Sequence, residues 1–108
     1  MRNIDEAFIQ NITRTIVEHF QPRRIVLFGS HARGEAGPDS DLDLMVEMES
    51  DQNFIERTTE VYSQFGLRDW AMDLLVLTPE EVSSQKDVLG TVVYTIEREG
   101  RTLYEKQA

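Results

Sequence analysis

A regular alternation of side chains between Asp41 and Met48 constrains the fold more than any other feature of the sequence. Successive side chains of a β-strand point to opposite faces of its sheet, so this segment is typical of a strand with one apolar face. The even-numbered positions are all apolar and would share the buried face. The other face would carry the odd-numbered residues Asp41, Asp43, Met45 and Glu47, which predicts two neighbouring carboxylates on one face of a sheet.

The segments on either side of this strand have the patterns of helices and of buried strands. Apolar residues recur every four positions from Ile4 to Phe20, which predicts an amphipathic helix. Asn3 or Asp5 can cap its start, and Pro22 ends it. The other expected elements are a buried strand at 24–28, a helix at 53–65 closed by Gly66, a strand at 72–77, a short helix opening at 79–81 after Thr78, a helix at 88–99, and an edge strand or docked tail at 103–104.

These mixed elements predict an α/β or α+β fold, in which helices flank a small mixed sheet. With 108 residues, the chain is expected to form one domain spanning 1–108. Its lack of cysteine excludes a disulfide scaffold and any thiolate metal site. No apolar run approaches the roughly 18 to 20 residues that span a bilayer. We therefore expect a cytoplasmic protein without a membrane partner.

The charge of the chain is strongly acidic, with 20 Asp and Glu residues against 11 Lys and Arg residues, and a net charge of -9. Because phosphate contacts need Lys and Arg, this balance argues against nonspecific binding to nucleic acid, although not against a nucleotide. Residues 35–51 hold seven acids and no base. A run of this kind can be a solvated loop, or it can contain functional carboxylates.

The dipeptide Gly29-Ser30 follows the expected strand at 24–28 and precedes a short helical stretch. Such a turn places free backbone N–H groups and a hydroxyl at a helix N-terminus, where they favour phosphate. The surrounding glycines match neither a Walker loop nor a dinucleotide fingerprint. By itself such a turn is weak evidence, because it more often has a purely structural role.

Three aspartates form the second candidate feature. Asp41 and Asp43 would repel each other on one strand face, and a bound Mg²⁺ would relieve that repulsion, although the face could simply meet water. Asp73 lies inside an apolar strand, where a bare carboxylate is costly without a partner or a metal. If the two strands are neighbours, three carboxylates converge as in a two-metal phosphoryl-transfer site. Alternatively, Asp73 is a strand-end acid satisfied by backbone donors.

The spacing of these residues is similar to a known signature. Gly29-Ser30, ten further residues and then Asp41-Leu42-Asp43 resemble the G-S-x₁₀-D-x-D motif of the DNA polymerase beta-like nucleotidyltransferase superfamily. The fuller runs at 29–34 and 40–44 resemble its minimal nucleotidyltransferase (MNT) branch. This resemblance implies a polymerase beta-like palm domain flanked by helices.

The resemblance also implies a role for each matching residue. Gly29 and Ser30 would hold the β- and γ-phosphates of ATP, and Asp41 and Asp43 would bind two Mg²⁺ ions. Asp73 would complete one metal site and help deprotonate the acceptor hydroxyl. Arg33 would neutralise phosphate or, equally, pair with an acid of the following loop. The implied nucleotide-binding residues are Gly29, Ser30, Arg33 and Ser40, while His19 and His31 are interpreted as surface residues without a role.

The acceptor is expected on a second chain, because larger relatives hold it on additional domains for which this chain has no room. Minimal members resemble antitoxins that neutralise HEPN-domain ribonuclease toxins by transferring AMP to a toxin tyrosine. An acidic surface suits a basic partner of this kind. The alternatives are a non-catalytic antitoxin that acts by complex formation, and a small-molecule (aminoglycoside-like) adenylyltransferase.

Overall fold

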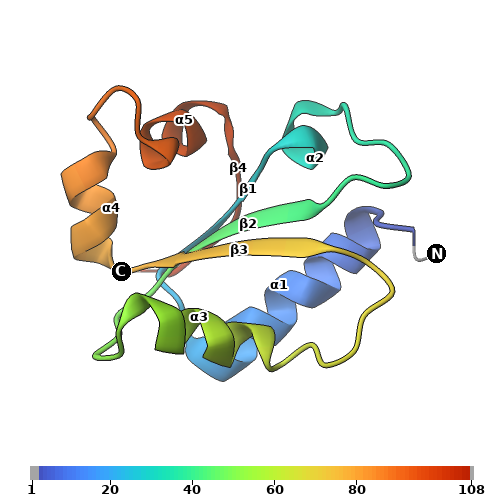
Figure 1. The fold of residues 1–108 in the computed structure, drawn as a ribbon, viewed down its shortest axis with the longest axis horizontal. Coiled ribbons are helices and arrows are strands. Elements are labelled where there is room, and N and C mark those ends of the chain that lie inside the picture. Colours follow the sequence, from blue (N-terminus) through green and yellow to red (C-terminus); the bar gives the residue numbers. More distant parts are fainter. Residues whose placement is uncertain (1–2, 108) are drawn as a thin grey trace.

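The computed structural model describes residues 3–107, in which helices and strands alternate along most of the chain (Figure 1). The elements are α1 (Glu6–Phe20), β1 (Arg24–Phe28), α2 (Ser30–Arg33), β2 (Leu42–Glu47), α3 (Phe54–Tyr62), β3 (Met72–Leu77), α4 (Pro79–Gln85), α5 (Val92–Glu99) and β4 (Arg101–Glu105).

The strands form a mixed sheet in the order β3-β2-β1-β4. Strand β1 runs antiparallel to both of its neighbours, whereas β2 and β3 are parallel. In Figure 1, α1 and α3 lie on one side of the sheet and α4 and α5 on the other, while α2 follows the end of β1. The predicted fold class, a small mixed sheet flanked by helices, is confirmed.

Side-chain caps set where the helices begin. Asp5 caps α1, so it is the one of the two predicted caps that the protein uses. The helix expected at 88–99 begins only at Val92, because the Thr91 hydroxyl caps it by accepting the Tyr94 N–H and the residues before Thr91 form a turn. None of the helices formed by residues 3–107 has the length and apolar character that a membrane crossing needs.

The end of α3 differs from the expected one, and the structure of residues 103–104 decides between the two alternatives. The helix expected at 53–65 ends at Tyr62, and residues 63–65 turn away before Gly66. The segment at 103–104 belongs to strand β4, which pairs with β1, so the edge-strand alternative is confirmed. The register of that pairing shifts between Ile25 and Val26, whose partners Tyr104 and Thr102 leave Leu103 of β4 as the extra residue.

The sheet separates two apolar clusters, and β2 contributes to both. The buried even-numbered side chains of β2 pack with α1 and α3 in the first cluster, as the alternation predicts. On the opposite face Met45 is fully buried with residues of α4 and α5. Glu47 on that face is also buried and pairs with Arg24, which reaches Glu97 of α5. The alternative that the odd-numbered face simply meets water is therefore wrong for the half that α4 and α5 cover.

Candidate active site

The sheet register brings together the residues that the sequence analysis singled out. Asp43 lies opposite Phe28 in the antiparallel pair of β1 and β2, and Gly29 follows Phe28 directly. In the parallel pair of β2 and β3, Asp43 lies beside Asp73. Three strands therefore place Gly29, Asp43 and Asp73 in a row across one end of the sheet.

The backbone at Gly29 packs directly against the Asp43 carboxylate. Its φ of 75° and ψ of -156° lie in a region that essentially only glycine adopts. A Cβ atom at this position would lie 2.1 Å from Oδ2 of Asp43. Helix α2 begins at the next residue, Ser30, and ends at Gly34, whose N–H donates to the Ser30 carbonyl oxygen. The Gly29 turn and Asp43, a candidate metal ligand, therefore pack directly against each other.

The Asp43 carboxyl has a pKa above its usual range. Partial burial is the largest cause, and the negative charges of Asp73 and then Asp41 add to it. A hydrogen bond with Asp73 raises the pKa further, whereas nearby His31 lowers it. The surroundings of Asp43 therefore disfavour its negative charge.

This donor set fits a divalent cation. Mg²⁺ prefers carboxylate oxygen, and its charge would relieve the repulsion between Asp43 and Asp73. Asp41 precedes β2 and is exposed. No three acidic or imidazole side chains among residues 3–107 lie close enough together to form a ready-made metal site. The expected convergence of three carboxylates is therefore found for Asp43 and Asp73, but not for Asp41.

Asp73 lies in a different environment from the one that the sequence predicts. The sequence suggested a carboxylate buried inside an apolar strand, but the Asp73 side chain is exposed. Strand β3 forms an edge of the sheet, so one of its sides lacks a neighbouring strand. Burial of its carboxylate therefore does not single out Asp73 as a candidate site residue. Its register position beside Asp43 does.

Two predicted nucleotide-binding side chains make local contacts instead. Arg33 forms an ion pair with Glu35 at 2.8 Å, which is the structural alternative considered for it. The Ser40 hydroxyl accepts a hydrogen bond from the Gly37 N–H at 2.8 Å and closes the turn before β2. Contact of either side chain with a nucleotide stays a prediction.

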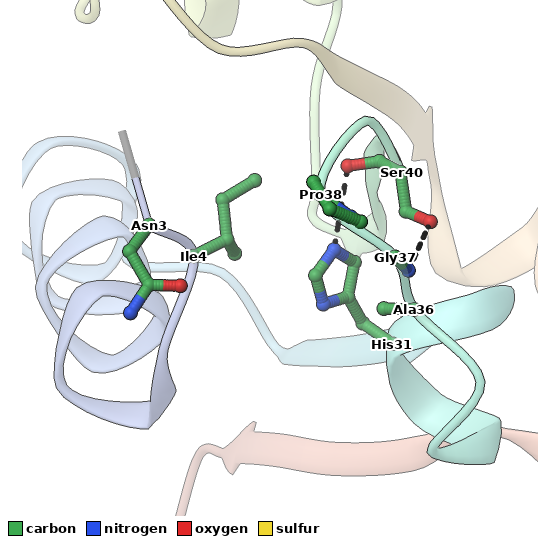
Figure 2. Close-up of a pocket in the computed structure, with 7 residues that line it drawn as sticks. All are labelled: Asn3, Ile4, His31, Ala36, Gly37, Pro38 and Ser40. Carbon is green, nitrogen blue, oxygen red and sulfur yellow. Dashed lines mark hydrogen bonds between the residues drawn. The ribbon is translucent and has the colours of Figure 1, made fainter. Parts of the chain in front are cut away.

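The two histidines differ from each other. His19 is exposed on α1, as the sequence analysis expected. His31 is half-buried, and its Nε2 atom lies 3.4 Å from the Ser40 carbonyl oxygen (Figure 2). His31 thus connects α2 to the loop that leads into Asp41, and its lack of a functional role stays a prediction.

Tyr62 at the end of α3 is a positioning residue that the sequence analysis did not identify. Its hydroxyl donates to the Met72 carbonyl oxygen at 3.0 Å and accepts from the Leu74 N–H at 2.8 Å. These two backbone groups flank Asp73 on the free edge of β3. No sequence pattern signals this contact, because it depends on how α3 packs beside the sheet.

Replacing Tyr62 with phenylalanine is expected to lower the free energy of unfolding by about 1–3 kcal/mol, because two backbone groups of β3 lose their partner. It should also lower the turnover number for nucleotidyl transfer, since Asp73 lies between those groups. Urea denaturation and a transfer assay measure the two effects. Tyr94→Phe on α5 is the matched control, and equal effects of both variants would contradict the positioning role.

Comparisons with known proteins show the family of the chain. A family model described as a nucleotidyltransferase domain matches residues 9–71. The chain is 36% identical over 92 residues to the protein adenylyltransferase MntA of Thermococcus cleftensis, and this match covers 82% of the chain and 90% of that protein.

Two solved structures share the fold. A provisionally assigned nucleotidyltransferase from Sulfolobus solfataricus has a TM-score of 0.64 and 19% identity, covering 91% of this chain and 78% of that chain. A crystal structure of a toxin-antitoxin with AMP-PNP contains a chain with a TM-score of 0.55 and 24% identity, covering 91% and 74%. At these identities the likeness concerns the fold alone.

Proposed function

The chain belongs to the nucleotidyltransferase domain family, and from that premise we propose that it transfers AMP from ATP to a tyrosine hydroxyl of a partner HEPN-type ribonuclease toxin. In this proposal the chain is the antitoxin, and the reaction takes place in the cytoplasm. The observation that carries it is the row of Gly29, Asp43 and Asp73 across three adjacent strands. A family member described as a protein adenylyltransferase supports a protein acceptor.

In this proposal the residues of the row act together with Ser30 and Asp41, each on one of the two substrates. The Gly29-Ser30 turn holds the β- and γ-phosphates, and Asp41, Asp43 and Asp73 would hold Mg²⁺, for which two ions are expected. A divalent ion bound there supplies charge neutralisation at the triphosphate. Asp73 accepts the proton of the acceptor hydroxyl. The hydroxyl oxygen bonds to the α-phosphorus while the bond to the β-phosphate breaks, and pyrophosphate leaves.

The charge of the chain supports a basic partner. With a net charge of -9, the protein attracts cationic surfaces and accelerates their encounter. A protein that cleaves RNA must itself bind phosphate, and therefore carries basic residues. The chain with the same fold in a toxin-antitoxin structure supports this kind of pairing.

The proposal is tested with ATP labelled at its α-phosphate. Incubation with Mg²⁺ and the product of the neighbouring gene should label that product on tyrosine. The double variant Asp41→Ala with Asp43→Ala should abolish the labelling. The matched control, Glu49→Ala with Asp51→Ala, removes two exposed acids of the same acidic run outside the row and should label normally.

Protection of cells separates this proposal from neutralisation by binding alone. The catalytic double variant is expected to lose protection against the neighbour's toxicity. If it protects as well as the wild type does, the chain neutralises its partner by complex formation and enzymatic neutralisation is wrong.

A further inference from the structure

The face of the sheet that carries Asp43 and Asp73 changes from apolar to polar along strand β3. Side chains at alternate positions of a strand share a face, so Asp73, Leu75 and Leu77 lie in one column. Leu77 is buried with residues of α4 and α5, Leu75 is half-buried against the same cluster, and Asp73 is exposed. Leu75 is therefore the apolar residue at the border between the covered part of this face and the proposed site.

The helices on this face of the sheet cover Leu75 only in part. Helix α4 follows the end of β3, and α5 packs on β1, which is two strands away from β3 (Figure 1). On the strand between them, Met45 lies opposite Leu75 in the register and is fully buried. The cover therefore decreases toward the start of β3, where Asp73 is exposed.

The opposite side of Asp43 is occupied by the Gly29 turn and by charged groups next to it. Gly29 packs directly against the Asp43 carboxylate. A hydrogen bond to Glu35 is the largest cause of the raised pKa of the Arg33 guanidinium, and the charges of Glu99 and Asp43 raise this pKa further. Arg33 of α2 and Glu99 at the end of α5 therefore both lie near the turn, and the β3 side is the open approach to the carboxylates.

The order of the strands gives the direction from which the acceptor approaches. In an in-line displacement, the attacking oxygen and the leaving pyrophosphate lie on opposite sides of the reacting phosphorus. The proposed phosphate-binding turn at Gly29 follows β1, and the sheet continues from β1 through Asp43 of β2 to Asp73 of β3. With the pyrophosphate held on the Gly29 side, the acceptor hydroxyl approaches from the Asp73 side, next to Leu75.

The spacing of Asp73 and Leu75 suits the side chain of a tyrosine. Residues two positions apart on a strand have Cα atoms roughly 6.5 Å apart. A phenol whose hydroxyl reaches the Asp73 carboxylate is long enough to lay its ring against Leu75, and this contact removes apolar surface of both groups from water. A serine or threonine carries its hydroxyl directly on Cβ and brings no ring to cover the leucine. The pair therefore favours an aromatic hydroxyl over an aliphatic one.

We propose that Leu75 is a specificity-determining residue for the acceptor, whose aromatic ring it contacts while the hydroxyl of that ring lies at the Asp73 carboxylate. This proposal rests on the proposed function and adds the residue that distinguishes tyrosine from serine and threonine. Leu75 takes no part in proton transfer or in metal binding. Its contact contributes to the binding of the acceptor ring and not to the binding of ATP.

The test is a double-mutant cycle between Leu75 and the ring of the acceptor. The tyrosine that labelled ATP marks in the product of the neighbouring gene is replaced there by phenylalanine or by alanine. Neither replacement can be modified, so the Kd of each complex is measured with Mg²⁺ and ATP present. The change from phenylalanine to alanine should raise the Kd by about 10-fold for the wild-type chain and by less than about 3-fold for Leu75→Ala. Because each ratio is taken within one variant, a lower folded fraction of Leu75→Ala cancels.

Leu103→Ala is the matched control, because Leu103 is also a half-buried leucine but lies on β4, at the opposite edge of the sheet. Its ratio should equal that of the wild type. Equal ratios for the wild type and Leu75→Ala would overturn the proposal. A weaker affinity of Leu75→Ala for ATP alone would also overturn it, because the adenine ring would then lie at Leu75. If no tyrosine is labelled, the proposed function itself fails, whereas a labelled tyrosine with equal ratios removes only the role of Leu75.

Discussion

Asp43→Asn is expected to stabilise the metal-free protein while it abolishes nucleotidyl transfer. Burial and the charges of Asp73 and Asp41 raise the pKa of Asp43, so its ionised form is disfavoured in the folded state. Asparagine removes that charge at nearly constant volume, and the Tm should rise by a few degrees. The transfer rate should fall by about 10²–10³-fold or more, as when a preorganised electrostatic group is removed.

The raised pKa of Asp43 also determines how the stability of the metal-free protein changes with pH. Because the folded-state pKa of Asp43 is raised, the folded protein binds more protons than the unfolded chain in the interval between the two values. The stability of the metal-free wild type should therefore decrease as the pH rises from its usual pKa through the raised one. This part of the decrease should be absent from Asp43→Asn.

Thermal denaturation between pH 3.5 and 7, with EDTA and then with Mg²⁺, measures both the stabilisation and its cause. Mg²⁺ should raise the Tm of the wild type and have little effect on Asp43→Asn. Asp51→Asn, an exposed acid outside the row, is the matched control and should change neither property. A lower Tm for Asp43→Asn in EDTA would show that the charge of Asp43 is balanced in the free protein, against the expectation.

Much of the fold follows from local patterns in the sequence. The alternation from Asp41 to Met48 predicts both the strand and its buried face, because all residues on one face are apolar and only that face can pack against the larger core. One boundary error arises where apolar residues do not reach the core. Val88 and Leu89 suggest an early helix start, yet both are exposed in the turn before Thr91.

The site is only partly predictable, because its key contacts join segments that are distant in the sequence. The Gly29 turn and the Asp41 and Asp43 pair became candidates because their spacing resembles a family signature. The exposure of Asp73 depends on how far α4 and α5 cover its face of the sheet, which local composition does not reveal. The contacts of Tyr62 and His31 depend on where α3 and the loop before β2 pack.

Gly29→Ala is expected to impair both the fold and the reaction, for two separable reasons. The backbone conformation at Gly29 costs about 1–3 kcal/mol for a residue with a side chain. In addition, the new Cβ would lie 2.1 Å from Oδ2 of Asp43, so the carboxylate must move. Because a displacement of about 1 Å at a reacting group can cost 10²-fold, the transfer rate should fall by about that factor.

Substitutions at Gly34 and Gly37, and a Gly29→Ala variant that lacks the Asp43 carboxylate, separate the backbone cost from the steric clash. Gly34 has a φ of 72° but open space around it, so Gly34→Ala should show the backbone cost without the clash. Gly37→Ala meets neither constraint and should leave stability nearly unchanged. Urea denaturation of Gly29→Ala in an Asp43→Ala background should reveal a smaller loss than in the wild type, because the clashing carboxylate is gone. An equal loss in both backgrounds would mean that the turn does not press on Asp43 and that the two are positioned independently.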